Sequence, residues 1–382
     1  MKASFFYCKN YFFLAFSQHL RYNTLTCFLE VMMRFYDELQ LNQAGSKELI
    51  RKSEDRKAKL YHIFVYLFKI AITVGFCFLF VTSFSMAFGS DNSIVGVVVL
   101  LYLLVFRNSH FTVKTNQSIL LIWLFYFLMA FMPRLANISN PIVGLFINTA
   151  SIAILVILGC HDPRLYNQST LVLSYLLIYG YDVSGSMYQK RLFALFIGAI
   201  LISLVFYFKH STKDYKATIA SVIRSFDLAS DTTRWQVCQI LCVPLVVCIV
   251  ELCGVHRSMW AGIAAMSVIL PFMADTKKRV SGRIIGNICG VIVFVILYFV
   301  LPSSIYAFIG IIGGIGVGLS AHYNFQAIFN TFGALAIASE LYGFKEALFL
   351  RIGTNVFGVV FALLFCVLAY KFLSKFQFAY KG

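Results

Sequence analysis

Residues 282–290 read Gly-Arg-Ile-Ile-Gly-Asn-Ile-Cys-Gly, and residues 310–318 read Gly-Ile-Ile-Gly-Gly-Ile-Gly-Val-Gly. Both stretches carry a glycine at every fourth position, and these glycines are Gly282, Gly286, Gly290, Gly310, Gly314 and Gly318. Glycines at this spacing lie on one stripe of a helix, where they let a second helix backbone approach closely. Because each set lies in an apolar run, the pattern predicts helix packing within a polytopic, all-α membrane bundle.

The composition supports a membrane protein. Hydrophobic residues make up 60% of the 382 residues, charged residues only 13%, and the mean hydropathy is +0.81. A soluble core of this length needs far fewer apolar side chains, so the excess is expected to face membrane lipids. The formal net charge is +16, but the basic residues lie in short stretches between apolar runs, so no nucleic-acid partner is expected.

Apolar windows about as long as the hydrocarbon core predict about twelve membrane spans. We place them near residues 62–88, 92–106, 118–133, 142–160, 169–181, 190–208, 237–254, 258–273, 282–301, 303–320, 322–340 and 346–372. The second, fifth and eighth of these windows are short.

The distribution of Lys and Arg predicts the orientation. Twenty-five of the 32 basic residues fall on one side of the predicted spans, six fall on the other, and Lys69 lies inside the first span. The six are Arg134, Lys190, Arg191, Arg257, Lys345 and Arg351. Both termini are therefore expected to be cytoplasmic.

Residues 1–61 form an N-terminal segment that does not resemble a secretory signal, because Lys9, Gln18 and His19 interrupt its apolar run. Its phenylalanines among basic residues suit a helix lying at the membrane interface. A poorly ordered leader, or a translation start at Met32 or Met33, is the alternative, and the sequence leaves both open.

An internal repeat is predicted in the rest of the chain. Gly89 and Ser93 correspond to Gly254 and Ser258, His161 corresponds to His322, and Arg191 with Gly198 corresponds to Arg351 with Gly358. The predicted parts are a six-span repeat at 62–208, a cytoplasmic linker at 209–236, a second six-span repeat at 237–374 and a tail at 375–382. An even number of spans in each repeat makes the two repeats parallel.

The second repeat contains a recognisable pattern. Ser258-Met-Trp260-Ala-Gly opens one span, and a basic loop followed by Arg283-Ile-Ile-Gly286-Asn-Ile-Cys-Gly290 enters the next. This pattern resembles the fusaric acid resistance and aromatic acid exporter family of bacterial membrane proteins. The resemblance is best across 237–372 and weaker across 62–208, and the chain lacks the large soluble domains of many members. It implies efflux of small, aromatic organic acids across a bacterial inner membrane, driven by the proton gradient.

Three arginines are candidates for binding an anionic substrate. Arg283 lies at the predicted cytoplasmic mouth, where its guanidinium could pair with an anion or act as an interface anchor. Arg191 and Arg351 lie at equivalent places on the side that positive charge avoids, so each needs a partner. Asp182 could serve Arg191, and Glu340, Glu346 or a substrate could serve Arg351; a purely structural pair is the alternative.

Other polar residues in the spans are weaker candidates. Glu251 and His322 could exchange protons during transport, because burial raises the pKa of a carboxylate and a histidine titrates near neutral pH. Either could instead be an interface residue. Asn330 and Thr331 could line a substrate path or bind neighbouring helices.

Several classes of function are not expected. The ten cysteines show no Cys-x-x-Cys, no metal-ligand spacing and no disulfide framework, so no metal or cofactor is predicted. Phosphate-binding loops, His-Glu-x-x-His and Gly-x-Ser-x-Gly are absent, so we do not expect an enzyme or an ATP-driven pump acting alone.

The expected function is proton-driven export of a small organic anion. Lys277, Lys278, Arg279 and Arg283 would gather the anion, and rocking of one half against the other would alternate access. The rival hypothesis is a non-transporting membrane scaffold or envelope-maintenance protein, and a homo-oligomer stays open under both.

Overall fold

The computed structural model describes residues 32–271, 273–306 and 308–379. Within these residues the chain is built of helices, and its only extended pairing is an isolated β-bridge between Val113 and Ala217. The described chain separates into two compact units. One comprises residues 32–74 and 318–321, and the other comprises residues 75–317 and 322–379.

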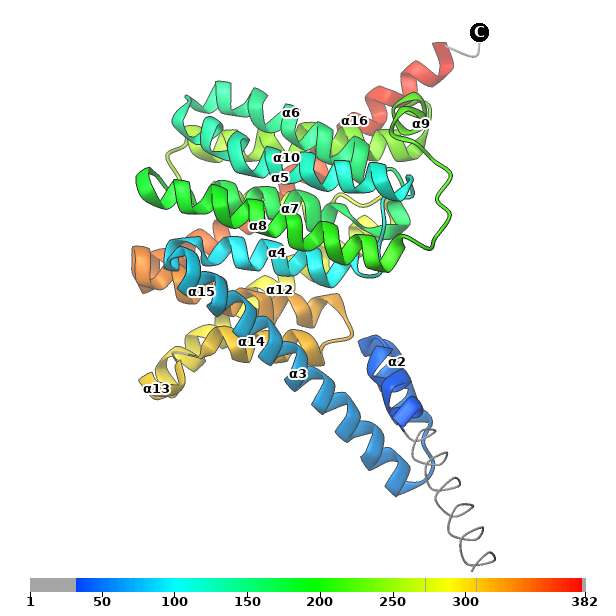
Figure 1. Ribbon diagram of the computed structural model, residues 1–382. Helices are drawn as coiled ribbons and strands as arrows, with labels where there is room; N and C mark the ends of the chain where they lie inside the picture. Colours follow the sequence, from blue (N-terminus) through cyan, green and yellow to red (C-terminus); the bar gives the residue numbers. More distant parts are fainter. Residues whose placement is uncertain (1–31, 272, 307, 380–382) are drawn as a thin grey trace, which may run out of the picture. The chain divides into compact units, whose positions relative to one another are not determined.

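The helices follow one another with short connections (Figure 1). The first set is α2 (Gln43–Lys52), α3 (Arg56–Phe88), η1 (Ser90–Asn92), α4 (Ser93–Phe106), α5 (Thr115–Ile138), α6 (Pro141–Gly159), η2 (Pro163–Leu165), α7 (Gln168–Gly180) and α8 (Gly185–His210). After α9 (Ile219–Arg224), the second set is α10 (Asp231–Leu252), α11 (Ser258–Val268), α12 (Met273–Val300), α13 (Ser303–Tyr306), α14 (Ile309–Leu319), α15 (Tyr323–Tyr342) and α16 (Phe344–Ala379).

Fewer helices have the length and hydropathy of a membrane span than the sequence predicted. Each of the twelve windows contains a helix, but in the described chain only seven helices are long and apolar enough to cross a membrane: α3, α5, α6, α8, α10, α12 and α16. The helices α4, α7, α11 and α14 have 14, 13, 11 and 11 residues. At 1.5 Å per residue these are about 16–21 Å long, which is less than the roughly 30 Å of hydrocarbon.

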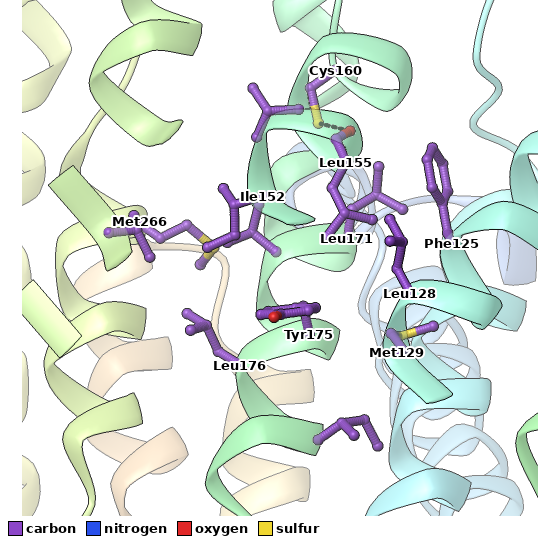
Figure 2. Packing of buried hydrophobic residues seen from close by; sticks show 14 of the residues in the cluster. Phe125, Leu128, Met129, Ile152, Leu155, Cys160, Leu171, Tyr175, Leu176 and Met266 are labelled. Atoms are coloured by element: carbon purple, nitrogen blue, oxygen red, sulfur yellow. Dashed lines mark hydrogen bonds between the residues drawn. The ribbon is translucent and has the colours of Figure 1, made fainter. Parts of the chain in front are cut away.

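Short helices form part of the buried core of the larger unit. Most residues of α7 and α11 are buried, and α7 packs against α5, α6 and α11. Figure 2 shows this packing, in which Tyr175 of α7 lies among apolar side chains that include Met129 and Ile152. The hydroxyl of Tyr175 donates a 2.7 Å hydrogen bond to Asn148 Oδ1, which satisfies a polar group inside the core.

Side chains of α10 satisfy the early end of α11. A helix that stops inside a membrane protein leaves carbonyl oxygens without partners, and these must be satisfied by protein groups. Trp235 Nε1 donates to the Ile269 carbonyl oxygen at 2.9 Å, and Gln239 Nε2 donates to the same oxygen at 2.8 Å and to that of Met266 at 3.1 Å. The short α11 is therefore a built feature of the fold.

The smaller unit contains the start of α3, where polar side chains of the predicted first span bind polar neighbours. Tyr66 Oη donates to the Gly318 carbonyl oxygen, and Lys69 Nζ donates to Ser46 Oγ at 2.6 Å and to the Leu41 carbonyl oxygen at 3.0 Å. The window at 62–88 thus includes a segment whose polar side chains bind polar neighbours. The part of this window without charged residues begins only at Ile70.

The first glycine set packs α12 against α15, as its spacing predicts. A Cβ atom added at Gly286 would lie 2.7 Å from both Ala327 Cβ and the Asn324 carbonyl oxygen. A Cβ atom at Gly290 would lie 2.7 Å from the Ile328 carbonyl oxygen, and one at Gly282 would overlap the side chain of Asn324. These distances leave no room for a side chain, so the two backbones approach closely.

The second glycine set differs from the expectation. A Cβ atom at Gly310 would meet nothing within 4 Å, and Gly314 is exposed. The glycines that face α15 are Gly313 and Gly316, which pack against Phe329. The stretch holds five glycines, so the four-residue spacing alone did not identify the packed face.

The same helix pairings recur in the two halves of the sequence. The helix α8 packs on α4 and α5, and α16 packs on α11 and α12. Gly198 of α8 lies against Val99 of α4, and Gly358 of α16 lies against Ala261 of α11. Within the larger compact unit, helices of the two halves are joined through α6 with α10 and α7 with α11.

Substituting Gly286 by leucine should destabilise the protein. The leucine must push α15 away from α12, and overpacking of this kind costs about 1–3 kcal/mol of unfolding free energy. Gly353→Leu is the matched control, because Gly353 is exposed within α16 and has open space around it. We expect a lower melting temperature in detergent for Gly286→Leu only; equal melting of both variants would contradict the packing.

Candidate functional site: arginines between α11, α12, α15 and α16

The glycine stripe of α12 positions a polar stripe beside it. Arg279, Arg283 and Asn287 follow one another at four-residue spacing, so they share one face of the helix. Arg283 directly follows Gly282, and Asn287 directly follows Gly286. Because the glycines bring α15 close, Arg279 lies over the ring of Tyr323 at the start of α15, with 3.5 Å between its guanidinium carbon and the ring centroid.

Arg283 joins three helices. Its Nη1 donates to Tyr323 Oη of α15 at 3.2 Å, and its Nη2 donates to Asn355 Oδ1 of α16 at 3.3 Å. Asn355 is itself fixed, because its Nδ2 donates to the Arg351 carbonyl oxygen at 2.8 Å. Asn355 and Arg351 are four residues apart and therefore lie on the same face of α16.

Arg351 is the most deeply buried arginine of this cluster, with 7% of its surface exposed. Its guanidinium lies 4.9 Å from the ring centroid of Trp260, near the start of α11. The Nε atom of Arg351 is buried and has no hydrogen-bond partner among the residues that the structure describes. Arg351 also interacts electrostatically with Arg283, a second cation.

The cluster has no acidic partner within the described chain. All ion pairs found among the described residues lie elsewhere. The expected partners of Arg351, Glu340 and Glu346, are exposed and form no ion pair with it. A charge buried in a membrane protein without a partner costs several kcal/mol. Neither of the two glutamates considered for Arg351 therefore neutralises it within the described chain.

Arg191, the equivalent arginine of the first half, has a different environment. It is 2% exposed, and its Nε donates to Asn92 Oδ1 at 3.0 Å while its Nη2 donates to the Asp91 carbonyl oxygen at 3.2 Å. Asp182, the partner expected from the sequence, instead pairs with Arg134. Arg191 is thus satisfied by its own half of the protein and is placed to hold α8 against η1.

Asn330 and Thr331 of α15 are not part of the arginine cluster. Thr331 is fully buried, and its Oγ1 lies 3.0 Å from the Ala327 carbonyl oxygen and 3.4 Å from Asn287 Oδ1. Asn330 is exposed. Thr331 therefore helps to join α15 to α12, which is the packing alternative left open by the sequence.

The two candidates for proton exchange lie apart from one another. Oε1 of Glu251, near the end of α10, accepts hydrogen bonds from Tyr179 Oη and from Ser258 Oγ, the latter at 2.8 Å. His322 is exposed at the residue before α15. Neither touches Arg283 or Arg351 through a hydrogen bond or ion pair in the described structure. The side chains of Lys277 and Lys278, expected at the same mouth as Arg283, lie outside the described residues, as does the N-terminal segment to residue 31.

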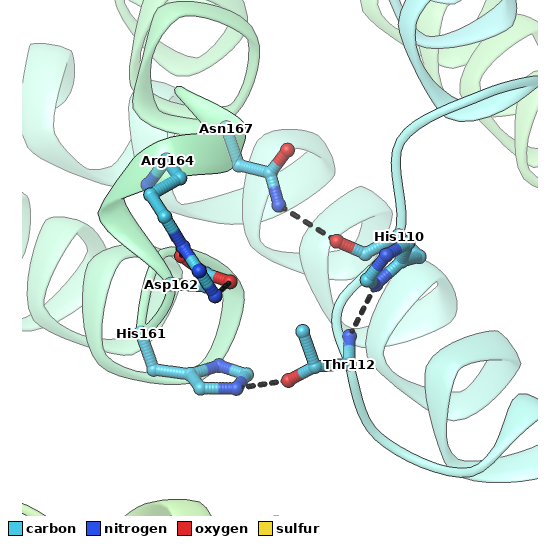
Figure 3. A network of polar contacts seen from close by, with 6 residues as sticks. All are labelled: His110, Thr112, His161, Asp162, Arg164 and Asn167. Carbon is cyan, nitrogen blue, oxygen red and sulfur yellow. Dashed lines mark hydrogen bonds and ion pairs between the residues drawn. The ribbon is translucent and has the colours of Figure 1, made fainter.

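A second polar network joins two loops of the first half (Figure 3). His161 Nε2 hydrogen-bonds to Thr112 Oγ1, and Asn167 Nδ2 donates to the His110 carbonyl oxygen at 3.0 Å. Burial lowers the pKa of both imidazoles, so both are mostly neutral near pH 7. Asp162 is held by Arg164, whose hydrogen bond lowers the pKa of that carboxyl group. This network binds the loops together. Its arginine, Arg164, is paired with a carboxylate, whereas the arginines of the second-half cluster have no carboxylate partner among the described residues.

Sequence reasoning missed several members of the cluster. Asn355 and Tyr323 were not candidates, although Asn355 lies four residues after Arg351 and Arg283 lies four residues after Arg279. That spacing could have indicated two polar helix faces. Arg257 was counted only for orientation, and nothing in the linear sequence indicates that Tyr323 reaches α12.

Comparison with known proteins agrees with the resemblance seen in the sequence. The model of a family described as fusaric acid resistance protein-like matches residues 245–365. This segment contains Trp260, Arg283, Arg351 and Asn355, so the matched region carries the arginine cluster. No curated protein and no solved structure matches the chain. Together with the seven long apolar helices, the match indicates a multi-pass membrane protein of transporter type.

Replacing the two equivalent arginines by methionine should have opposite effects on stability. Arg351→Met removes a buried charge without an acidic partner, so it should stabilise the fold by about 1–4 kcal/mol. Arg191→Met leaves Asn92 without its donor and should destabilise the fold by about 1–3 kcal/mol. Thermal melting of the two full-length variants in one detergent tests this. A loss of stability in Arg351→Met as large as in Arg191→Met would show that Arg351 is a structural residue.

Proposed function

We propose that this chain is a membrane transporter that carries small organic anions and binds them between Arg283 and Arg351. The observation that supports this most strongly is a buried arginine without a carboxylate partner beside a second arginine, in the segment that matches the family model. A guanidinium binds a carboxylate through paired hydrogen bonds. The ring of Trp260 next to Arg351 suits a substrate with an apolar, aromatic body.

The proposal includes two parallel six-span repeats, about twelve spans in all. The recurring packing of α8 on α4 and of α16 on α11 supports it. A glycine with positive φ precedes the second helix of each half, at Gly89 and Gly254, and another lies at the start of the sixth, at Gly185 and Gly343. Because α4, α7, α11 and α14 are short, the corresponding spans would cross the bilayer only together with their flanking segments.

The excess of Lys and Arg on one side supports an orientation in which both termini are cytoplasmic, here in a bacterial inner membrane. Arg279 then lies toward the cytoplasm, and an anion would enter there and leave at the opposite end. Efflux driven by the proton gradient is the direction that the family resemblance implies. Glu251, which binds two hydroxyl groups near the exit end, is the residue best placed to exchange a proton.

A non-transporting scaffold is the alternative function. A scaffold needs tight helix packing, which the α12–α15 contact provides, but it gains nothing from buried cations without partners. Charged residues inside membrane proteins are costly and are usually retained for function. The arginine cluster therefore favours a transporter, and no catalytic step is part of the proposal.

Binding and transport of benzoate test the proposal. Trp260 becomes the single tryptophan after Trp123→Phe and Trp235→Phe, and benzoate should change its fluorescence while the uncharged isostere benzamide should not. In liposomes, Arg283→Gln should lower benzoate transport at least tenfold, and Arg283→Lys should keep part of it because an ammonium lacks the guanidinium fork.

Arg164→Gln is the matched control, because Arg164 is exposed in a loop of the first half and is bound to Asp162. It should transport benzoate like the parent. Equal transport by the parent protein, by Arg283→Gln and by empty liposomes would contradict the transporter and favour the scaffold.

A further inference from the structure

Among the residues that the structure describes, Arg257 is the fourth arginine of the second half whose buried Nε atom has no hydrogen-bond partner, together with Arg279, Arg283 and Arg351. It precedes the first turn of α11 and has φ +61°, a left-handed conformation that is uncommon for a residue with a side chain. Such a conformation is costly and persists only where surrounding contacts impose it. The contacts of Arg257 must therefore hold it in place.

The contacts of Arg257 join the two halves of the sequence. Its Nη1 donates to the Gly180 carbonyl oxygen at the end of α7, at 3.2 Å. Its guanidinium lies 4.5 Å from the ring centroid of Tyr181, which follows α7, and 5.5 Å from that of Tyr342, at the end of α15. The backbone of α7 lies close to α11 at this point, because a Cβ atom at Gly180 would overlap the side chain of Met259 in α11.

The four arginines are linked through shared neighbours. Tyr323 contacts both Arg279 and Arg283, and Asn355 connects Arg283 to the main chain of Arg351. Tyr181 interacts electrostatically with both Arg351 and Arg257. The series of arginines begins at Arg279, in the second turn of α12, and ends at Arg257, directly before α11. Because the last residue of α11 leads into the start of α12, Arg279 and Arg257 belong to opposite ends of α11.

Glu251 does not neutralise Arg257. Glu251 lies at the same end of α11, but its Oε1 accepts hydrogen bonds from Tyr179 and Ser258, and it forms no ion pair among the described residues. His256 stacks on Tyr342, with 5.1 Å between the ring centroids. Arg257 is thus held by a neutral carbonyl group and two aromatic faces, which are weaker partners for a guanidinium than a carboxylate.

We propose that Arg257 is the exit residue of the anion path, which closes that end by binding Gly180 and Tyr181 and releases them when an anionic carboxylate arrives from Arg351. This inference rests on the proposed function. An arriving carboxylate gives the Arg257 guanidinium a charge-assisted hydrogen bond in place of the one to a neutral carbonyl oxygen. Its arrival therefore favours separation of α7 from α11. The exit end would therefore open only when an anion is present.

Transport and binding of benzoate should separate in Arg257 variants. In the single-tryptophan protein, Arg257→Gln should bind benzoate within twofold of the parent, because Arg257 is outside the inner site. In liposomes its benzoate transport should fall at least tenfold, with Arg257→Lys intermediate. Equal losses of binding and transport would place Arg257 in the inner site, and unchanged transport would remove it from the path; either result overturns the proposal.

Hydrogen exchange tests the closure independently of transport. In Arg257→Gln, backbone amides at 180–184 and 254–258 should exchange at least tenfold faster than in the parent. Arg134→Gln is the matched control, because Arg134 pairs with Asp182 within the first half and should leave 254–258 unchanged. Unchanged exchange in Arg257→Gln would overturn the closure. If the parent neither binds nor transports benzoate, the proposed function fails for that substrate, while the exchange result still decides whether Arg257 closes this end.

Discussion

The close contact between α12 and α15 is the constraint on which the candidate site depends. Gly282, Gly286 and Gly290 leave no room for side chains on the face of α12 that meets α15. This contact brings Tyr323 to Arg279 and Arg283, and the adjacent face of α12 then reaches Asn355 on α16. Bulkier residues on the stripe would separate the helices and remove the neighbours that hold Arg283. The geometry of the candidate site therefore depends on the packing of α12 against α15.

The two halves share a helix arrangement but treat their buried arginines differently. Arg191 is bound by Asn92 and the Asp91 carbonyl oxygen, whereas Arg351 faces Trp260 and a second arginine. With the offset that relates Gly89 to Gly254, the position of Asn92 corresponds to Arg257. The second half therefore has a cation where the first half has the amide that satisfies its arginine. The environments of the two buried arginines thus differ between the halves, which is why the proposed anion site is placed in the second half.

Part of this arrangement could be predicted from the sequence. Composition and charge predicted an all-helical membrane bundle, and glycine spacing predicted the packed face of α12, because hydropathy and helix periodicity are local properties. The length of single helices was harder to predict. The end of α11 depends on Trp235 and Gln239, which satisfy its carbonyl groups from a different helix. Such tertiary contacts override the length expected from hydropathy.

The site was predicted only where single residues were unusual. Arg283 and Arg351 were identified because charges are rare in apolar segments. Asp182, expected to pair with Arg191, forms its ion pair with Arg134. Arg134 lies on α5, far from Asp182 in the sequence, so the sequence does not indicate this pair. Asn330 was a candidate by composition but lies on the exposed face of α15, and Tyr323 was missed because aromatic residues are common throughout this chain. Contacts between distant segments decide these cases.

A structure of the full-length protein with 4-bromobenzoate tests the central claim most directly, because bromine identifies the position and direction of the ligand. The account predicts a carboxylate within hydrogen-bond distance of both Arg283 and Arg351, with the ring against Trp260. Ligand density elsewhere, with the two guanidinium groups unchanged and unoccupied, would contradict it.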